Sequence, residues 1–190
     1  MAAKRVLKYL HQSADLWRCL GQKEGVGKLK LAAYADASYA SCTETRRSRV
    51  GGILTLGGYP IHHTTKLQQT VATSSTEAEY MGLTSIIKDI QFASGLLNEL
   101  GYAQEETVIL WEDNKGAIDL VNTTKHHERA KHIDVQHHYI REVVEKGTVK
   151  FQYIPTTEQL ADIFTKALGP HKFLKLRENL GIQFREGVGE

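Results

Sequence analysis

The sequence predicts an α/β protein in which helices pack on a mixed β-sheet. Three apolar segments separated by short turns come first, and further apolar segments then alternate with helical patterns. Strands joined by short turns pair antiparallel, whereas strands separated by helices usually pair parallel, so both kinds of pairing are expected in one sheet. The expected strands are 29–35, 50–56, 59–65, 107–111 and 148–154.

The helices are predicted from apolar residues spaced three and four positions apart. The longest covers 75–100, where Leu83, Ile87 and Ile90 begin a stripe that continues to Leu100, and Gly101 ends it. The remaining expected helices are 3–11, 115–122, 133–146, 158–168 and 170–180.

Length and composition exclude several classes of protein. A chain of 190 residues with 41% hydrophobic residues suits one domain with short appendages. A net charge of +2 is too small to indicate nucleic-acid binding, so any basic surface must come from clustering. Two cysteines, Cys19 and Cys42, provide no disulfide framework. No apolar run reaches the roughly 18 residues of a membrane span, and no secretory signal is expected.

Two acidic residues follow the most apolar strands. Asp36 comes directly after the run 31–35, and Asp113, with Glu112 beside it, comes after 108–111. A carboxylate in such a place is costly unless it is paired or binds a metal ion. The alternative is that each is an acid in a turn that ends a strand.

Helical phase separates the two acids at the start of helix 75–100. Glu79 lies four residues before Leu83 and shares its core-facing stripe, whereas Glu77 is about 200° away and faces outward. Ser74 and Glu77 match a capping box, which explains Glu77 structurally. Thr76 and Glu79 also fit that pattern, so a capping role for Glu79 stays open.

Asp162 lies in the expected helix 158–168. It is about 200° from Leu160 and therefore avoids the main apolar stripe. An acid near a helix N-terminus also has a structural role, because it interacts favourably with the helix dipole. If Asp162 nevertheless joins Asp36, Glu79 and Asp113, the four carboxylates form an oxygen site for Mg²⁺ or Mn²⁺. Two such ions about 4 Å apart suit phosphodiester hydrolysis.

Five segments, in this order, resemble one family. YADAS, TSSTEAEYMGL, WEDNKGAI, KHIDVQHHYIRE and QLADIFTKAL are similar to the ribonuclease H domain of copia-type LTR-retrotransposon reverse transcriptases, and the resemblance covers about 3–180. It implies a ribonuclease H-like fold, with a five-stranded mixed sheet and helices on both faces. It also implies that the chain is the C-terminal part of a Pol polyprotein.

The resemblance implies an endonuclease that hydrolyses the RNA strand of RNA–DNA hybrids during reverse transcription. Its catalytic and metal-binding residues would be Asp36, Glu79, Asp113 and Asp162, which hold two Mg²⁺ ions that Mn²⁺ can replace. Asp36 would bridge both ions, Glu79 and Asp113 would complete the first site, and Asp162 the second. Two alternatives remain: a catalytically inactive connection or partner-binding module, and a DNA nuclease or integrase-type member of the same fold.

Two features depart from the cellular enzymes of this type. Their loop histidine has no counterpart in 155–159, where Thr156 and Thr157 stand instead. Their inserted basic helix has no room either, because only 123–132 is available.

Three basic clusters flank the expected site and suggest phosphate contacts, although each could also be a solvated face. Five histidines fall within 126–138, but their spacing matches no tetrahedral zinc site, and His137 lies on an apolar helical stripe. The residues expected to contact nucleic acid are Arg46, Arg47, Arg49, Lys125, Arg129, Lys131, Lys172 and Lys175.

The same resemblance suggests a division of the chain. Residues 1–21 would end the preceding polymerase or connection region, 22–169 would form the ribonuclease H domain, and 170–190 a basic helix and tail. The expected partners are an RNA–DNA hybrid and the polymerase domain of the same polyprotein, with no membrane. The expected location is intracellular, in a cytoplasmic virus-like particle or the nucleus.

Overall fold

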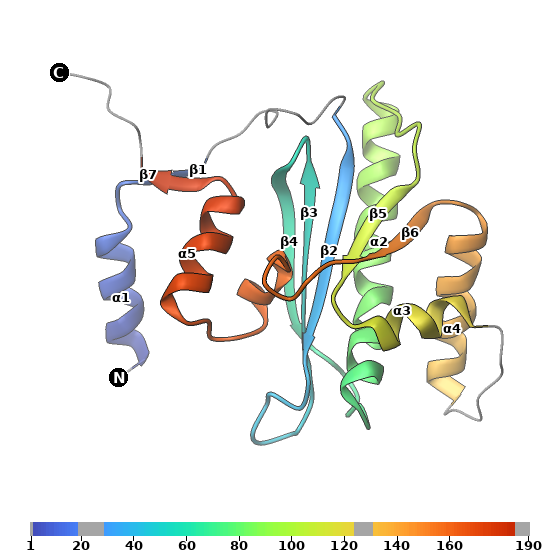
Figure 1. Cartoon of the computed structure of the whole chain (residues 1–190), viewed down its shortest axis with the longest axis horizontal. Helices are drawn as coiled ribbons and strands as arrows, with labels where there is room; N and C mark the ends of the chain where they lie inside the picture. The colour runs from blue at the N-terminus through green and yellow to red at the C-terminus, as the bar shows by residue number, and fades with distance from the viewer. Residues whose placement is uncertain (1, 19–28, 124–130, 185–190) are drawn as a thin grey trace.

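A five-stranded mixed sheet forms the centre of the computed structural model, which describes residues 2–18, 29–123 and 131–184. The strand order is β4-β3-β2-β5-β6, so β2 is central (Figure 1). β2 pairs antiparallel with β3 and parallel with β5, which confirms the predicted mixed sheet. The strands are β2 (Leu31–Ser38), β3 (Arg49–Leu56), β4 (Tyr59–Leu67), β5 (Val108–Glu112) and β6 (Val149–Tyr153).

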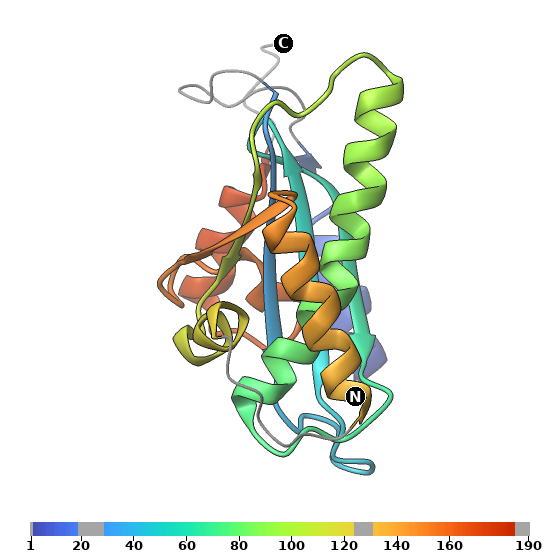
Figure 2. The ribbon, with the colours of Figure 1, turned by 90° about the vertical axis from the view of Figure 1, so that its right-hand side faces the viewer.

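Helices cover both faces of this sheet, as the resemblance implied. On one face α2 (Ser75–Glu99) crosses β2 and β3, and α4 (Lys131–Glu145) lies beside it (Figure 2). Leu83, Ile87 and Ile90 of the predicted stripe are fully buried there, whereas Leu100 at its end is exposed. The Cδ1 atom of Ile86 lies directly over the Cα of Gly52. α3 (Lys115–Asn122) follows the end of β5 and contacts α2 and α4.

The opposite face holds the short 3₁₀ helix η1 (Leu160–Phe164) and α5 (Pro170–Asn179). Leu176 of α5 and Leu160 of η1 pack with Ile53 of β3 in a second, smaller core. Thr165 and Phe164 lie directly over Gly51, where a side chain larger than hydrogen has no space. Gly51 and Gly52 therefore let η1 and α2 approach β3 closely from opposite sides.

A separate two-stranded sheet joins the two ends of the chain. β1 (Leu16–Arg18) pairs antiparallel with β7 (Ile182–Phe184). α1 (Ala2–Gln12) lies next to α5, with the Tyr9 and Phe173 rings edge to face at 6.0 Å. Neither strand was predicted, because a three-residue strand is too short to show a period-2 pattern.

Two predictions of local structure were wrong. Asp36 was expected after the strand 29–35, but β2 continues to Ser38, so Asp36 lies within it opposite Gly51. The expected helix 158–168 is the five-residue η1. The side-chain oxygen of Gln159 accepts a hydrogen bond from the backbone of Ala161, and Pro170 opens a new helix soon after, so η1 stays short. Among the described residues, no helix is long and apolar enough to span a membrane.

Candidate active site

Asp36 lies on the sheet face that η1 covers. Its side chain is fully buried, and the Thr165 hydroxyl donates a hydrogen bond to its Oδ2 atom. Burial raises the pKa of Asp36, although the ammonium of Lys166 opposes this shift. The strand register explains the direction of the side chain, since Asp36 has the same parity as Tyr34, which packs in the core beneath η1 and α5.

Glu79 comes from the first turns of α2. The hydroxyl of Ser74 accepts a hydrogen bond from the backbone N–H of Glu77 at 3.1 Å, and the Glu77 carboxylate accepts one from the backbone of Thr73 at 2.5 Å. Glu79 is buried, with 7% of its surface exposed, whereas Glu77 is half-buried. The helical phase was therefore predicted correctly, and Ser74, not Thr76, is the N-cap of α2.

Asp113 follows the last residue of β5. One carboxylate oxygen from each of Asp36, Glu79 and Asp113 lies within 4.8 Å of the other two. The three acids thus come from the central strand, its parallel neighbour and the helix that covers them, and they meet at the carboxyl ends of β2 and β5. This is the place where open sheets with parallel strands usually bind ligands.

Glu112 is a buried acid beside this cluster that was not predicted as a site residue. Val108, Leu110 and Glu112 occupy alternate positions of β5 and therefore share the face that α2 covers. Glu112 is fully buried there. Its Oε1 atom accepts a hydrogen bond from the backbone N–H of Asn114 at 3.0 Å, and Asn114 caps α3. Glu112 thereby fixes the turn that carries Asp113. The alternation of Val108, Leu110 and Glu112 was the signal that could have revealed its burial.

Burial and the neighbouring carboxylates disfavour the ionised form of the acids in this cluster. Burial raises the pKa of Glu79 to about 11, and the carboxylates of Glu112, Asp36 and Asp113 add to this shift. Burial also raises the pKa of Glu112 well above its usual range. A divalent cation would neutralise this charge in place of protons. The carboxylate oxygens of Asp36, Glu79 and Asp113 fit Mg²⁺ or Mn²⁺, which prefer such ligands.

Asp162 is fully buried in η1, although its helical phase predicted a position away from the apolar residues. The structure does not bring it into the three-acid group; Lys166 links it to Asp36. The Nζ atom of Lys166 lies 2.8 Å from Oδ1 of Asp36 and 2.7 Å from Oδ1 of Asp162. Lys172 pairs with the second oxygen of Asp162. Three of the four predicted acids therefore form one group, and Lys166 lies between Asp36 of that group and the fourth acid, Asp162.

The predicted phosphate-binding residues fall into three groups. Arg46 and Arg49 are exposed near the β2–β3 loop, and Arg47 is half-buried there. Lys172 and Lys175 already form ion pairs within the chain, with Asp162 and Glu158. The remaining predictions lie outside the described residues or concern a side chain that is not described: Lys125, Arg129 and Lys131.

The described part of the histidine segment shows no metal site. His137 packs its ring on the fully buried Tyr80, with ring centroids 5.6 Å apart, as its position on an apolar stripe predicted. The possible metal group found among the described residues contains carboxylates alone.

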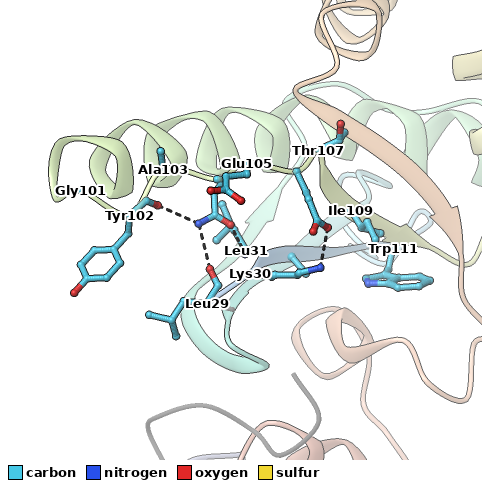
Figure 3. A pocket seen from close by; sticks show the side chains of 13 residues that line it. Leu29, Lys30, Leu31, Gly101, Tyr102, Ala103, Glu105, Thr107, Ile109 and Trp111 are labelled. Carbon is cyan, nitrogen blue, oxygen red and sulfur yellow. Dashed lines mark hydrogen bonds and ion pairs between the residues drawn. The ribbon is translucent and has the colours of Figure 1, made fainter. Parts of the chain in front are cut away.

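A pocket of about 610 Å³ lies at the opposite ends of β2 and β5 (Figure 3). Lys30 and Glu106 form an ion pair at 2.8 Å within it, and Ile109 and Trp111 line its wall. The pocket shares no residue with the carboxylate cluster and is a separate feature of the molecule.

Comparison with solved structures shows that the chain has a ribonuclease H-like fold. It matches LC11-RNase H1 in complex with an RNA/DNA hybrid with a TM-score of 0.54 and 16% identity, over 72% of this chain and 94% of that one. It matches a foamy viral protease-reverse transcriptase in complex with an RNA/DNA hybrid with a TM-score of 0.50 and 14% identity, over 77% of this chain and 21% of that one.

The chain is homologous to the Pol polyproteins of plant copia-type retrotransposons, as its five segments predicted. It is 37% identical to the polyprotein of transposon TNT 1-94 of Nicotiana tabacum over 95% of this chain and 13% of the polyprotein. It is also 37% identical to that of transposon RE2 of Arabidopsis thaliana over 95% of this chain and 12% of the polyprotein. The chain thus spans about an eighth of these relatives' length. No family model matches it.

Proposed function

We propose that this protein is a metal-dependent endonuclease that hydrolyses the RNA strand of RNA–DNA hybrids during retrotransposon reverse transcription. The observation that carries this proposal is the group formed by Asp36, Glu79 and Asp113, buried at the carboxyl ends of β2 and β5 in a ribonuclease H-like fold. Homology to Pol polyproteins supports it, because reverse transcription produces such hybrids.

The four carboxylates would form two adjacent metal sites that share Asp36. Asp36, Glu79 and Asp113 would hold one Mg²⁺ ion, and Asp36 with Asp162 would hold a second. Bound Mg²⁺ supplies Lewis-acid activation of the attacking water and charge stabilisation of the leaving oxygen. The water oxygen attacks phosphorus and the bond to the 3′ oxygen breaks, so the products carry 5′-phosphate and 3′-hydroxyl ends. Glu112 would hold the Asp113 turn in place through Asn114.

The substrate is proposed from the relatives and the charge distribution. Two of the matched structures are complexes with an RNA/DNA hybrid. In this chain Arg46 and Arg49 are exposed on the loop side of β3, which begins beside the end of β2 that carries Asp36. These guanidinium groups would contact the phosphates that flank the scissile bond.

The second proposed partner is the polymerase domain of the same polyprotein. α1 exposes Val6, Leu7 and Leu10, each with more than half of its surface in solvent, while Tyr9 packs on Phe173. An exposed apolar helix face suits packing against a preceding region. We therefore propose that residues 1–21 end the polymerase or connection region, 22–169 form the nuclease domain, and 170–190 form a C-terminal helix and tail.

The alternative is an inactive module that binds partners through the same fold. Cleavage assays on a labelled RNA–DNA hybrid, duplex DNA and duplex RNA, each with and without Mg²⁺, separate the possibilities. The proposal expects cleavage of the RNA strand of the hybrid with Mg²⁺ alone. Cleavage of duplex DNA would indicate a DNA nuclease, and no cleavage of any substrate by the folded chain would support the inactive module.

A further inference from the structure

Lys166 is placed where a cation would sit between two of the proposed metal-binding acids. Its ammonium contacts Oδ1 of Asp36 at 2.8 Å and Oδ1 of Asp162 at 2.7 Å, and both carboxylates are fully buried. Burial alone would lower the pKa of Lys166, but these two carboxylates outweigh burial and raise it. Lys166 therefore carries its positive charge into the buried half of the site.

The contacts of Asp162 are satisfied within the chain. Lys166 occupies its Oδ1 atom and Lys172 its Oδ2 atom, so both oxygens face ammonium groups. A divalent ion between Asp36 and Asp162 must take the same two Oδ1 oxygens that Lys166 holds. Ion and ammonium also repel each other at such short range, so they compete for one position.

The three-acid group is in a different electrostatic situation. Among the described residues, no salt bridge reaches Glu79 or Asp113, and the Oδ2 atom of Asp36 accepts a hydrogen bond only from the neutral Thr165 hydroxyl. Lys166 contacts one acid of this group, Asp36, through Oδ1. An ion held by Glu79, Asp113 and the Oδ2 atom of Asp36 would leave that contact in place. The two halves of the site share Asp36 but differ in their other ligands: no salt bridge of the described residues involves Glu79 or Asp113, whereas both oxygens of Asp162 pair with lysines.

We propose that Lys166 is a built-in counter-cation that keeps a second divalent ion out of the Asp36–Asp162 position while no nucleic acid is bound. This inference rests on the proposed function, since it assumes that the three-acid group binds a metal ion. Lys166 acts through the carboxylates that it contacts and is a positioning residue. The sequence spacing of Asp162 and Lys166, four residues apart, permits this contact, although η1 is not a regular α-helix.

The test counts Mn²⁺ ions bound to the full chain without nucleic acid, by electron paramagnetic resonance of free Mn²⁺ and by titration calorimetry. At concentrations that saturate the first site, wild type should bind one ion per chain and Lys166→Met two. Lys166→Arg retains the positive charge and should bind one. Lys175→Met removes a lysine that pairs with Glu158, and this variant should also bind one ion.

Circular dichroism of each variant must show that it is folded, because unfolding exposes buried carboxylates that also bind Mn²⁺. If Lys166→Met does not fold, Lys166→Gln provides the same test with a polar side chain. Two ions bound to wild type, or one ion bound to the folded neutral variant, would overturn the role of Lys166 and leave the metal site intact. No ion bound to wild type would contradict the proposed function itself.

Discussion

At the scale of single residues, the candidate site depends on Glu79 facing inward while Glu77 faces the helix cap. Glu79→Gln should eliminate hybrid cleavage, because it removes a carboxylate oxygen from the group with Asp36 and Asp113. Glu77→Gln should mainly weaken the cap of α2 and cost about 1 kcal/mol of stability. Cleavage rates and thermal unfolding of both variants check this asymmetry. Loss of cleavage in folded Glu77→Gln, with activity retained in Glu79→Gln, would contradict it.

The raised pKa of Glu79 predicts how the metal-free protein responds to pH. The pKa is about 11 in the folded chain and 4.5 for the ordinary group, so between these values the folded state binds more protons than the unfolded state. The contribution of Glu79 to the free energy of unfolding is therefore fully present below about pH 4.5 and is lost as pH rises toward 11. Glu79→Gln stays neutral and avoids that loss.

In EDTA, Glu79→Gln should therefore gain stability relative to wild type as pH rises from 5 to 9. The slope is at most about 1.4 kcal/mol per pH unit, and coupling with Glu112 and Asp36 reduces it. Denaturant unfolding of both proteins at several pH values measures the difference. A difference that does not change with pH would mean that Glu79 is not held in its neutral form.

Sequence reasoning found the residues of the three-acid group because each has a local signal. Asp36 and Asp113 end apolar runs, and Glu79 continues the stripe of α2. Lys166 belongs to the C-terminal basic cluster, but no local signal indicated that it or Thr165 would contact Asp36, which is about 130 positions away. The burial of Asp162 was missed for a related reason: helical phase was applied to a segment that forms a five-residue 3₁₀ helix.

At the scale of secondary structure, Gly51 controls how closely η1 approaches β3. A Cβ atom there would lie 2.5 Å from the Cγ2 atom of Thr165 and 3.0 Å from the Cβ atom of Phe164. Gly51→Ala should therefore push η1 away from the sheet, lower stability by about 1–3 kcal/mol and reduce cleavage, because η1 carries Asp162.

Gly95→Ala is the matched control. Gly95 is exposed near the C-terminal end of α2, and a methyl group added there would meet no atom within 4 Å. Alanine should therefore stabilise the helix by about 0.5–1 kcal/mol and leave cleavage unchanged. Denaturant unfolding and cleavage rates of Gly51→Ala and Gly95→Ala, each compared with wild type, test both expectations. Wild-type stability and activity in Gly51→Ala would show that η1 does not need this close contact.

Strand and helix types were predicted well, and their ends less well. Apolar runs and helical stripes identified the five strands of the main sheet and α2, but the end of β2 depends on its pairing with β3, which extends to Ser38. The β1–β7 pair joins residues more than 160 positions apart, and local patterns do not report such pairing.

At the scale of the whole molecule, the affinity for the hybrid should come from clusters of basic residues, because the net charge of the chain is only +2. Replacing Lys125, Arg129 and Lys131 by alanine should weaken hybrid binding and flatten the slope of log affinity against log salt by about two to three. Titrations at several salt concentrations measure this slope. Equal affinity and parallel lines for wild type and variant would show that 125–131 does not contact the phosphates.

The central claim is that the carboxylates at the ends of β2 and β5 bind the catalytic metal. The most direct measurement compares Mg²⁺-dependent cleavage of an RNA–DNA hybrid by wild type, Asp36→Asn and Asp113→Asn, with folding of each variant checked by circular dichroism. The asparagine variants keep the shape of the side chain but lose the charge that holds the ion. Wild type should cleave the RNA strand, and both folded variants should be inactive. Near-normal cleavage by either folded variant would contradict the assignment of this site.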